Sequence, residues 1–243
     1  MWEPFSELRL VCRACLLRGL VAIAIFVVAI ATLVSCTPEA PTPPKAEPKA
    51  PVQTSAQEEA PDLAPPAARK YRRTITGAAQ SVWGLGAPVP VFGAQVHQES
   101  AWNEQARSPV GAQGLAQFMP ATADWIDDVY PDLGPHQPYN PTWALSALVR
   151  YDKHLWDRTE GITECDRMAF ALSGYNGGAG WVTKDKAVAA RNGDDPRRYW
   201  GSVEKYNAGR KQEFFNENRG YPPRILKTLQ PKYTTWGRTI ACP

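Results

Sequence analysis

The chain has 243 residues, of which 44% are hydrophobic and 21% charged, and this length suits one globular domain with appended segments. Residues 1–36 carry a net charge of +1 and residues 37–68 carry −3, so the total of +3 places +5 on residues 69–243. This mildly basic charge suits an anionic polymer as a partner and argues against the strongly basic surface of a nucleic-acid-binding domain.

The first 36 residues have the layout of an export signal. Three arginines precede residues 19–35, which contain no charge, so the run is either a long signal sequence or a marginal transmembrane helix. It ends in LVSC at residues 33–36, which resembles the lipobox of bacterial lipoproteins. We expect a signal peptide with lipidation at Cys36 or, alternatively, an uncleaved signal anchor. Either places the rest of the chain in the cell envelope, on the periplasmic side. Thr37 follows where an Asp would indicate inner-membrane retention, which favours the outer membrane.

Residues 37–68 are rich in Pro and Ala and contain no aromatic residue, so they are not expected to build a core. Proline-rich chains stay extended at roughly 3 Å per residue. We expect these residues to be a disordered tether that holds a domain, residues 69–243, away from a membrane.

The five cysteines fall into three groups. Cys12 and Cys15 form a CxxC pair with no partner pair after it, and we interpret them as inert. Once Cys36 is set aside, Cys165 and Cys242 remain. An oxidising compartment permits a disulfide between them, and the alternative is two free buried thiols.

Helical patterns dominate from residue 69 onward. Pro88 and Pro90 predict the start of a helix that leads to Ser100. Apolar residues at helical spacing predict a second helix within residues 141–158.

Further helices are expected downstream. Thr163, with Asp166 three residues later, predicts a capping box at the start of a helix. Segments 196–206 and 222–230 each begin at proline and are predicted as two more. No long alternating strand pattern is present, so the expected fold class is mainly α, with little or no β-sheet.

Five short motifs follow one another between residues 78 and 237. They are QES at 98–100, SPVGAQGLAQFMP at 108–120, NPTWAL at 140–145, LSGYNGGAGWV at 172–182 and ENRGYPPRIL at 217–226. In order and spacing they resemble the catalytic domain of soluble lytic transglycosylases, a family that shares its fold with goose-type lysozyme. The resemblance implies a lysozyme-like helical domain with a deep substrate cleft. Ala116, Gly174 and Pro222 depart from the family pattern, which usually has Met, Ala and an apolar residue there.

Glu99 is the candidate catalytic residue. Cleaving a glycosidic bond near neutral pH needs an acid that keeps its proton, and apolar surroundings raise the pKa of a carboxyl because burial disfavours the charged form. Val91, Phe92 and Val96 give Glu99 such an approach on the predicted helix. Without the motifs, a lone Glu on a helix would be interpreted as a solvated surface residue.

The resemblance implies a peptidoglycan lytic transglycosylase that cleaves the β-1,4 bond between N-acetylmuramic acid and N-acetylglucosamine. Glu99 would protonate the bridging oxygen, and its carboxylate would then accept the proton of the C6 hydroxyl, which closes a 1,6-anhydro ring. The substrate's N-acetyl group would stabilise the positive charge, so the second carboxylate of most glycosidases is not required. Asp124, Asp127 and Asp128 are interpreted as the exposed face of a helix.

The resemblance also implies a substrate-binding floor and wall. Gly114 would permit close backbone approach, and the amide of Gln117 would bind sugar groups as donor and acceptor. Phe118 and Met119 would form an apolar wall or ordinary core. Ser100 points away from Glu99 around the helix, so substrate contact is expected of it rather than a catalytic role.

The later motifs supply the other side of the expected cleft. Tyr175 and Asn176 would line it, and Tyr221 matches the tyrosine that in the family hydrogen-bonds near the catalytic Glu. Glu217 resembles a structural partner beneath the cleft.

No metal or cofactor is expected. The HQE at 97–99 resembles the His-x-Glu of zinc deaminases, but no Pro-Cys-x-x-Cys follows, and metalloprotease, phosphate-loop and dinucleotide motifs are lacking from the sequence. The expected partners are peptidoglycan glycan strands and a membrane, through the lipid or signal anchor, and the expected state is a monomer. Two rival interpretations remain: a hydrolytic goose-type muramidase and a catalytically weak peptidoglycan-binding lipoprotein.

Overall fold

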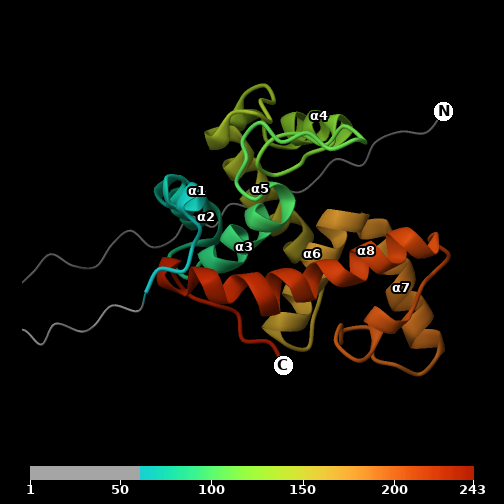
Figure 1. The fold of residues 1–243 in the computed structure, drawn as a ribbon. Helices are drawn as coiled ribbons and strands as arrows, with labels where there is room; N and C mark the ends of the chain where they lie inside the picture. Colours follow the sequence, from blue (N-terminus) through green and yellow to red (C-terminus); the bar gives the residue numbers. More distant parts are fainter. Residues whose placement is uncertain (1–60) are drawn as a thin grey trace, which may run out of the picture. The chain divides into compact units, whose positions relative to one another are not determined.

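The computed structural model describes residues 61–243 (Figure 1). The predicted export signal with Cys36, and residues 37–60 of the predicted tether, lie outside the described residues. Within residues 61–243, none of the helices combines the length and the hydropathy that crossing a lipid bilayer requires.

The described chain is built from helices. Residues 61–243 contain no β-strand and only isolated bridges, from Gln113 to Arg107 and to Phe118. The expected mainly α fold is therefore confirmed. In chain order the elements are α1 (Pro66–Arg69), α2 (Arg72–Trp83), α3 (Val89–Ser100), α4 (Pro120–Val129), η1 (Pro131–Leu133), α5 (Pro141–Asp157), α6 (Glu164–Gly177), α7 (Ala179–Arg191), η2 (Val203–Lys205), α8 (Gln212–Pro223), the π-helical η3 (Arg224–Leu229) and η4 (Gln230–Trp236).

Helix α6 is the centre of the core. All residues from Met168 to Leu172 are buried, so protein surrounds this helix on every side. It packs against α5, α7 and α8, as Figure 1 shows. Helix α3 packs on η3 and η4. Helices α3 and α6 are therefore both packed against helices that follow much later in the sequence, η3 and η4 for α3 and α8 for α6.

The starts of α5 and α6 are determined by their caps. Helix α5 begins at Pro141, and Asn140 caps it. The Asn140 side chain accepts a hydrogen bond from the backbone N–H of Thr142 at 2.9 Å. At the start of α6, Thr163 accepts from the backbone N–H of Asp166 (3.0 Å), and the Asp166 carboxylate accepts from that of Thr163 (3.2 Å). The predicted capping box is confirmed.

The helix predicted over residues 196–206 is wrong. These residues form turns and the single short η2. The Oδ1 atom of Asp166, at the start of α6, accepts hydrogen bonds from the backbone N–H groups of Tyr199 (2.8 Å) and Trp200 (3.3 Å). A side chain of another element therefore takes the donors that a local helix would use.

The start of the helix predicted at 222–230 is also wrong. Helix α8 already begins at Gln212 and passes through Pro222 and Pro223 into η3. A proline inside a helix removes an N–H donor and crowds the carbonyl four residues earlier. The wider turns of η3 follow directly, and the helical path continues through them.

The folded domain begins before the boundary predicted at residue 69. Ala64 and Ala68 are buried, and the Arg69 guanidinium donates to the Ala64 carbonyl oxygen at 3.2 Å. Alanine is small enough to pack closely, so a Pro- and Ala-rich composition concealed these core contacts at the end of the predicted tether.

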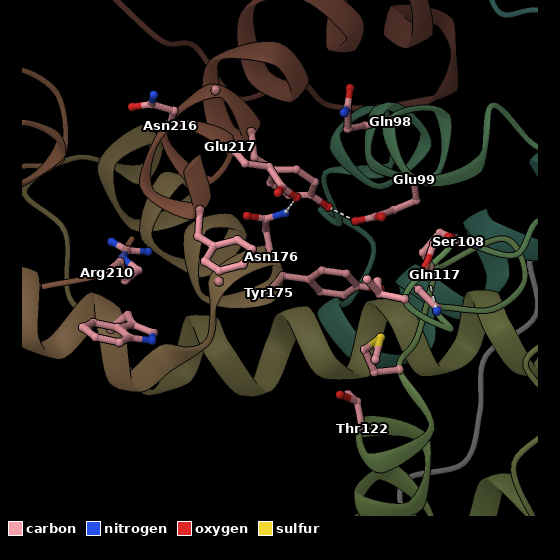
Figure 2. A pocket seen from close by; sticks show the side chains of 18 of the residues that line it. Gln98, Glu99, Ser108, Gln117, Thr122, Tyr175, Asn176, Arg210, Asn216 and Glu217 are labelled. Atoms are coloured by element: carbon pink, nitrogen blue, oxygen red, sulfur yellow. Dashed lines mark hydrogen bonds between the residues drawn. The ribbon is translucent and has the colours of Figure 1, made fainter. Parts of the chain in front are cut away.

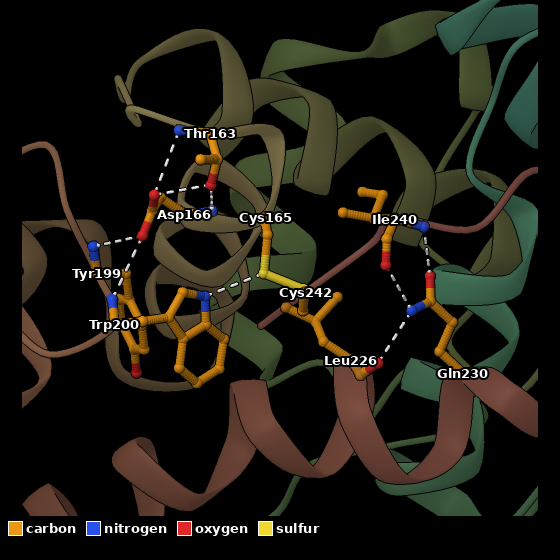
Figure 3. Close-up of a disulfide and its surroundings, with 9 residues drawn as sticks. All are labelled: Thr163, Cys165, Asp166, Tyr199, Trp200, Leu226, Gln230, Ile240 and Cys242. Carbon is orange, nitrogen blue, oxygen red and sulfur yellow. Dashed lines mark hydrogen bonds between the residues drawn. A yellow bond between two sulfur atoms is a disulfide. The ribbon is translucent and has the colours of Figure 1, made fainter.

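Cys165 and Cys242 form a disulfide that ties the C-terminal segment to the start of α6 (Figure 3). Of the two states expected for these cysteines, the structure has the bonded one. Gln230 holds the same segment, because its amide donates to the Ile240 carbonyl (3.0 Å) and accepts from the Ile240 N–H (2.8 Å). The C-terminal segment is thus attached at two neighbouring points.

A double Cys165→Ser/Cys242→Ser variant should be less stable, because the bond closes a loop across 77 residues. We expect the free energy of unfolding to fall by about 2–4 kcal/mol, measured by denaturant titration. A reductant should lower the stability of the wild type by a similar amount and leave the double variant unchanged. Equal unfolding midpoints for oxidised wild type and double variant would contradict a structural role of the disulfide.

Candidate active site

A cleft of about 1150 Å³ opens where the end of α3, the loop before α4, the end of α6 and helix α8 meet (Figure 2). It brings together residues from motifs that lie far apart in the sequence. The predicted site residues that line it are Glu99, Gln117, Phe118, Met119, Tyr175, Asn176, Glu217 and Tyr221.

Glu99 lies in the last turn of α3. The helix ends there because Ala101 and Trp102 adopt left-handed backbone angles, with φ of +49° and +67°. The indole of Trp102 is buried, and its N–H donates to the Tyr233 hydroxyl at 2.7 Å. This anchor positions the end of α3, and with it Glu99, at the edge of the cleft.

Burial raises the pKa of Glu99 to about 7, because the surrounding protein disfavours the charged carboxylate. The buried hydroxyl of Tyr221 donates to Oε1 of Glu99 and lowers this pKa, while the negative charge of Glu217 raises it (Figure 2). Desolvation is the largest effect, so Glu99 titrates near neutral pH and can act in both its protonated and its ionised form.

Gly114 allows the loop before α4 to pack against the segment before α5. Its φ is +72°, and a Cβ atom there would lie 1.7 Å from the carbonyl oxygen of Pro138. Its N–H donates to the carbonyl of Ala106 at 2.8 Å. Only glycine fits this combination of backbone angle and contact.

Gln117 turns its amide into the loop rather than wholly into the cleft. Its Nε2 atom donates to the carbonyls of Gly114 (2.9 Å) and Ala106 (3.2 Å), which uses both N–H groups. The side-chain oxygen is left to accept a hydrogen bond from a ligand. The sequence predicted that the Gln117 amide offers the substrate both a donor and an acceptor. In this geometry only the acceptor is free for the substrate.

Tyr175 joins the end of α6 to the same loop. Its hydroxyl donates to the Ala116 carbonyl at 2.7 Å, and its ring lies 5.3 Å from that of Tyr151 and 5.8 Å from that of Phe118. Phe118 is 2% exposed and Met119 41% exposed. Phe118 is therefore mainly core at the base of the wall, whereas Met119 presents an apolar surface to the cleft.

Residues 86–197 match the family model described as the transglycosylase SLT domain. We name the folded part of the chain, residues 61–243, the SLT domain after this match. The match includes the end of α3, the loop before α4 and the end of α6, so it covers Glu99, Gln117 and Tyr175. Helix α8 with Tyr221 lies beyond it.

Curated relatives of this SLT domain include two membrane-bound lytic murein transglycosylases. Membrane-bound lytic murein transglycosylase F of Vibrio vulnificus (strain YJ016) is 30% identical over 134 residues, which are 54% of this chain and 24% of the relative. Membrane-bound lytic murein transglycosylase F 2 of Alkalilimnicola ehrlichii is 34% identical over 112 residues, 45% of this chain and 23% of the relative. The chain thus spans less than a third of either relative.

A solved structure shares the fold. The 70 kDa soluble lytic transglycosylase from Escherichia coli aligns with 67% of this chain and 24% of its own chain, at a TM-score of 0.52 and 24% identity. The expected lysozyme-like helical fold is confirmed.

Asn176 and Glu217 approach each other in the SLT cleft (Figure 2). The Asn176 amide donates to Oε1 of Glu217 at 3.4 Å and accepts from the buried Asn218 amide at 3.1 Å. Asn218 in turn accepts from Arg210 (3.0 Å), which also pairs with the fully buried Asp185. This network supports Asn176 from behind. Arg210 and Asp185 lie outside the motifs, and no pattern in the sequence predicted their pairing.

The structure places Ser100 outside the cleft. Its hydroxyl donates to the Val96 carbonyl of its own helix at 3.2 Å. Asp124, Asp127 and Asp128 lie on α4, and none of them lines the cleft. Asp127 instead accepts from the backbone N–H of His136 at 3.0 Å.

Several cleft residues were not assigned from the sequence. Gln98 and Trp181 lie inside motifs that pointed to their neighbours, whereas Lys211 and Phe214 lie in none. Phe214 is 55% exposed at the start of α8. Among residues 61–243, no group of three or more His, Cys, Asp or Glu is arranged to hold a metal ion.

Gly114→Ala should be far more damaging than Gly111→Ala, its matched control in the same loop. Gly111 also has a positive φ, +97°, but a Cβ there meets no heavy atom within 4 Å. We expect the control to lose about 1–2 kcal/mol of unfolding free energy. The Gly114 variant should lose at least about 3 kcal/mol, because the clash adds to the strain. Similar losses in chemical denaturation would contradict the close packing on Pro138.

Proposed function

We propose that the SLT domain is a peptidoglycan lytic transglycosylase that cleaves the β-1,4 bond between N-acetylmuramic acid and N-acetylglucosamine. The relatives named lytic murein transglycosylases support the reaction class. The observation that carries the proposal is the environment of Glu99. This residue lies in the cleft with a pKa of about 7 and accepts a hydrogen bond from the Tyr221 hydroxyl. A carboxyl group with this pKa is matched to proton transfer near neutral pH.

In the first step, protonated Glu99 donates its proton to the bridging oxygen. The glycosidic bond breaks, the N-acetylglucosamine side leaves with a hydroxyl, and positive charge develops at C1 of N-acetylmuramic acid. The substrate's own N-acetyl group stabilises this charge. Glu99 is then a carboxylate, and the Tyr221 hydroxyl stabilises that form by donating to Oε1.

In the second step, the Glu99 carboxylate accepts the proton of the C6 hydroxyl, and the C6 oxygen bonds to C1. A 1,6-anhydro ring closes, no water is consumed, and Glu99 regains its proton for the next cycle. One residue can serve as acid and then base because its pKa lies near the working pH.

The other cleft residues would bind and orient the sugars. The free side-chain oxygen of Gln117 can accept a hydroxyl or amide proton, and Asn176 presents its polar side chain opposite. Tyr175 holds the Ala116 carbonyl at the cleft wall, and Met119 offers an apolar contact. Ser100 is left out of the substrate-binding set because it lies outside the cleft.

We further propose that the domain works in the cell envelope, on the periplasmic side. The arginines before residue 19 and the apolar run at 19–35 support export. Lipidation at Cys36 in the outer membrane, with residues 37–60 as a tether and the folded domain as a monomer, is the arrangement that we favour over a signal anchor. The names of the two relatives describe those proteins as membrane-bound.

A hydrolytic muramidase is the second candidate. Glu217 favours it, because it is a second carboxyl group in the same cleft and most glycosidases use a pair. In the proposed reaction, Glu217 instead raises the pKa of Glu99 by its charge and holds Asn176.

Glu99→Gln should lower the release of soluble fragments from purified peptidoglycan by about 10²–10⁴-fold, because the amide cannot donate or accept the catalytic proton. Mass spectrometry of the wild-type products should find fragments lighter by one water than the hydrolysis products. Glu217→Gln is the matched control and should still yield anhydro fragments. Wild-type activity in Glu99→Gln, or hydrolysis products that vanish in Glu217→Gln, would contradict single-carboxyl transglycosylation.

The pH dependence of kcat/KM should distinguish Tyr221 from the neighbouring Tyr175. Activity should fall as pH rises through about 7, because Glu99 loses its proton there. In Tyr221→Phe the ionised form of Glu99 loses its donor, so this fall should move upward by about one pH unit. Tyr175→Phe should leave the pH of this fall unchanged, because the Tyr175 hydroxyl binds the Ala116 carbonyl and not Glu99. A downward shift in Tyr221→Phe would contradict the assigned hydrogen bond.

A further inference from the structure

A further carboxyl group, that of Asp152, lies behind the cleft in the interior of the SLT domain. Asp152, on α5, and Gln95, on α3, are both 0% exposed, and the Gln95 amide donates to Oδ1 of Asp152 at 3.3 Å. Gln95 precedes Glu99 by one helical turn, so the two side chains lie on the same side of α3. Tyr151, beside Asp152 in sequence, lines the cleft.

The hydrogen bonds of this pair are incomplete if Asp152 is ionised. Within residues 61–243, the Oε1 atom of Gln95 and the Oδ2 atom of Asp152 are buried without a hydrogen-bond partner. Both atoms are acceptors when Asp152 is a carboxylate. One proton on Oδ2 changes this, because the acid O–H can donate to Oε1 of Gln95 while Oδ1 still accepts from its amide. A neutral Asp152 therefore satisfies both groups.

The surrounding charges favour the same state. In the described part of the chain, no Lys, Arg or His nitrogen lies within 4 Å of the Asp152 carboxyl, so a buried negative charge there would be uncompensated. The titratable groups that face it are Glu99 on α3, Tyr151 beside it on α5, Tyr175 on α6 and Tyr221 on α8. None of these supplies a positive charge. Burial raises the pKa of Asp152 well above its usual range; the hydrogen bond from the Gln95 amide lowers this pKa in part, and the charge of Glu99 raises it.

We propose that Asp152 remains protonated in the folded protein and, through its two-way hydrogen bonding with Gln95, is a positioning residue for Glu99. The pair joins α3 to α5 one turn behind the catalytic carboxyl, which fixes where Glu99 meets the substrate. Because Asp152 is neutral, it adds no negative charge on the interior side of Glu99 to that of Glu217 in the cleft. The positioning role rests on the proposed function, whereas the protonation state does not.

Asp152→Asn tests the protonation state without any turnover. Asn keeps a donor for Oε1 of Gln95 and an acceptor for its amide, but does not titrate. Unfolded wild type releases the Asp152 proton above about pH 4, and the folded protein retains it. The unfolding equilibrium constant of wild type, relative to that of Asp152→Asn, should therefore rise about tenfold per pH unit from about pH 5 upward, until the pH reaches the pKa of Asp152 in the folded protein.

The matched control is Asp157→Asn on the same helix, whose exposed side chain pairs with Lys153. The ratio of the unfolding equilibrium constant of wild type to that of Asp157→Asn should not change with pH over this range. Denaturant titrations at each pH supply all three constants. A pH-independent ratio for Asp152→Asn would overturn the proposal, because Asp152 would then be ionised in both states.

Kinetics test the positioning role. Asp152→Asn should keep the kcat of the wild type and the same alkaline fall in activity, because Asn and a protonated Asp are both neutral. Asp152→Leu fills the space without hydrogen bonds, so kcat should fall at least about tenfold with little change in KM. If the alkaline fall in activity occurred at a lower pH in Asp152→Asn than in the wild type, Asp152 would be charged in the wild type. An unchanged kcat in a folded Asp152→Leu would overturn the positioning role.

Discussion

The hydrogen bond between the Tyr221 hydroxyl and Glu99 connects residues that lie 122 positions apart, and the proposed chemistry depends on it. Desolvation alone would hold Glu99 in its acid form, which could protonate a substrate but would be slow to accept a proton afterwards. One donor from α8 partly offsets that effect and leaves the pKa at about 7. A single side chain can then serve in both halves of a two-step proton transfer.

The rest of the SLT domain keeps this contact in place. The middle of helix α6, Met168 to Leu172, is buried on all sides, so the helix holds Tyr175 and Asn176 at a constant position in the cleft wall. Trp102 anchors the end of α3 through Tyr233, which lies on η4 beyond α8. Helix α3 with Glu99 is therefore held by η4, and helix α8 with Tyr221 is held by its packing against α6.

The sequence predicted the parts of the fold that depend on local chemistry. The capping box at Thr163 and the proline-led start of α3 follow from neighbouring residues, and the structure has both. The helix predicted at 196–206 failed because Asp166, some 30 positions away, takes its backbone donors. Helices α2 and α7 were not predicted from the sequence: α2 buries only Ile75 and Ala79, and α7 only Val182, Asp185 and Ala189.

The site was predictable to the extent that its residues sit in motifs. Glu99 and Tyr221 were found in this way, and the structure brings them together. The orientation of the Gln117 amide was not predictable, because it depends on the backbone of a folded loop. The pairing of Asp152 with Gln95 was not predictable either: Asp152 lies among the charged residues Arg150 and Lys153, and only tertiary contact reveals that it is buried against Gln95.

The most direct test of this account is the ionisation of Glu99 itself. Carbon-detected NMR of the labelled protein can follow the Glu99 carboxyl through a pH titration, with its signal assigned by its loss in Glu99→Gln. The account predicts a midpoint at about 7. A midpoint near the ordinary value of 4.5 would contradict it, because Glu99 would then carry no proton to donate at neutral pH.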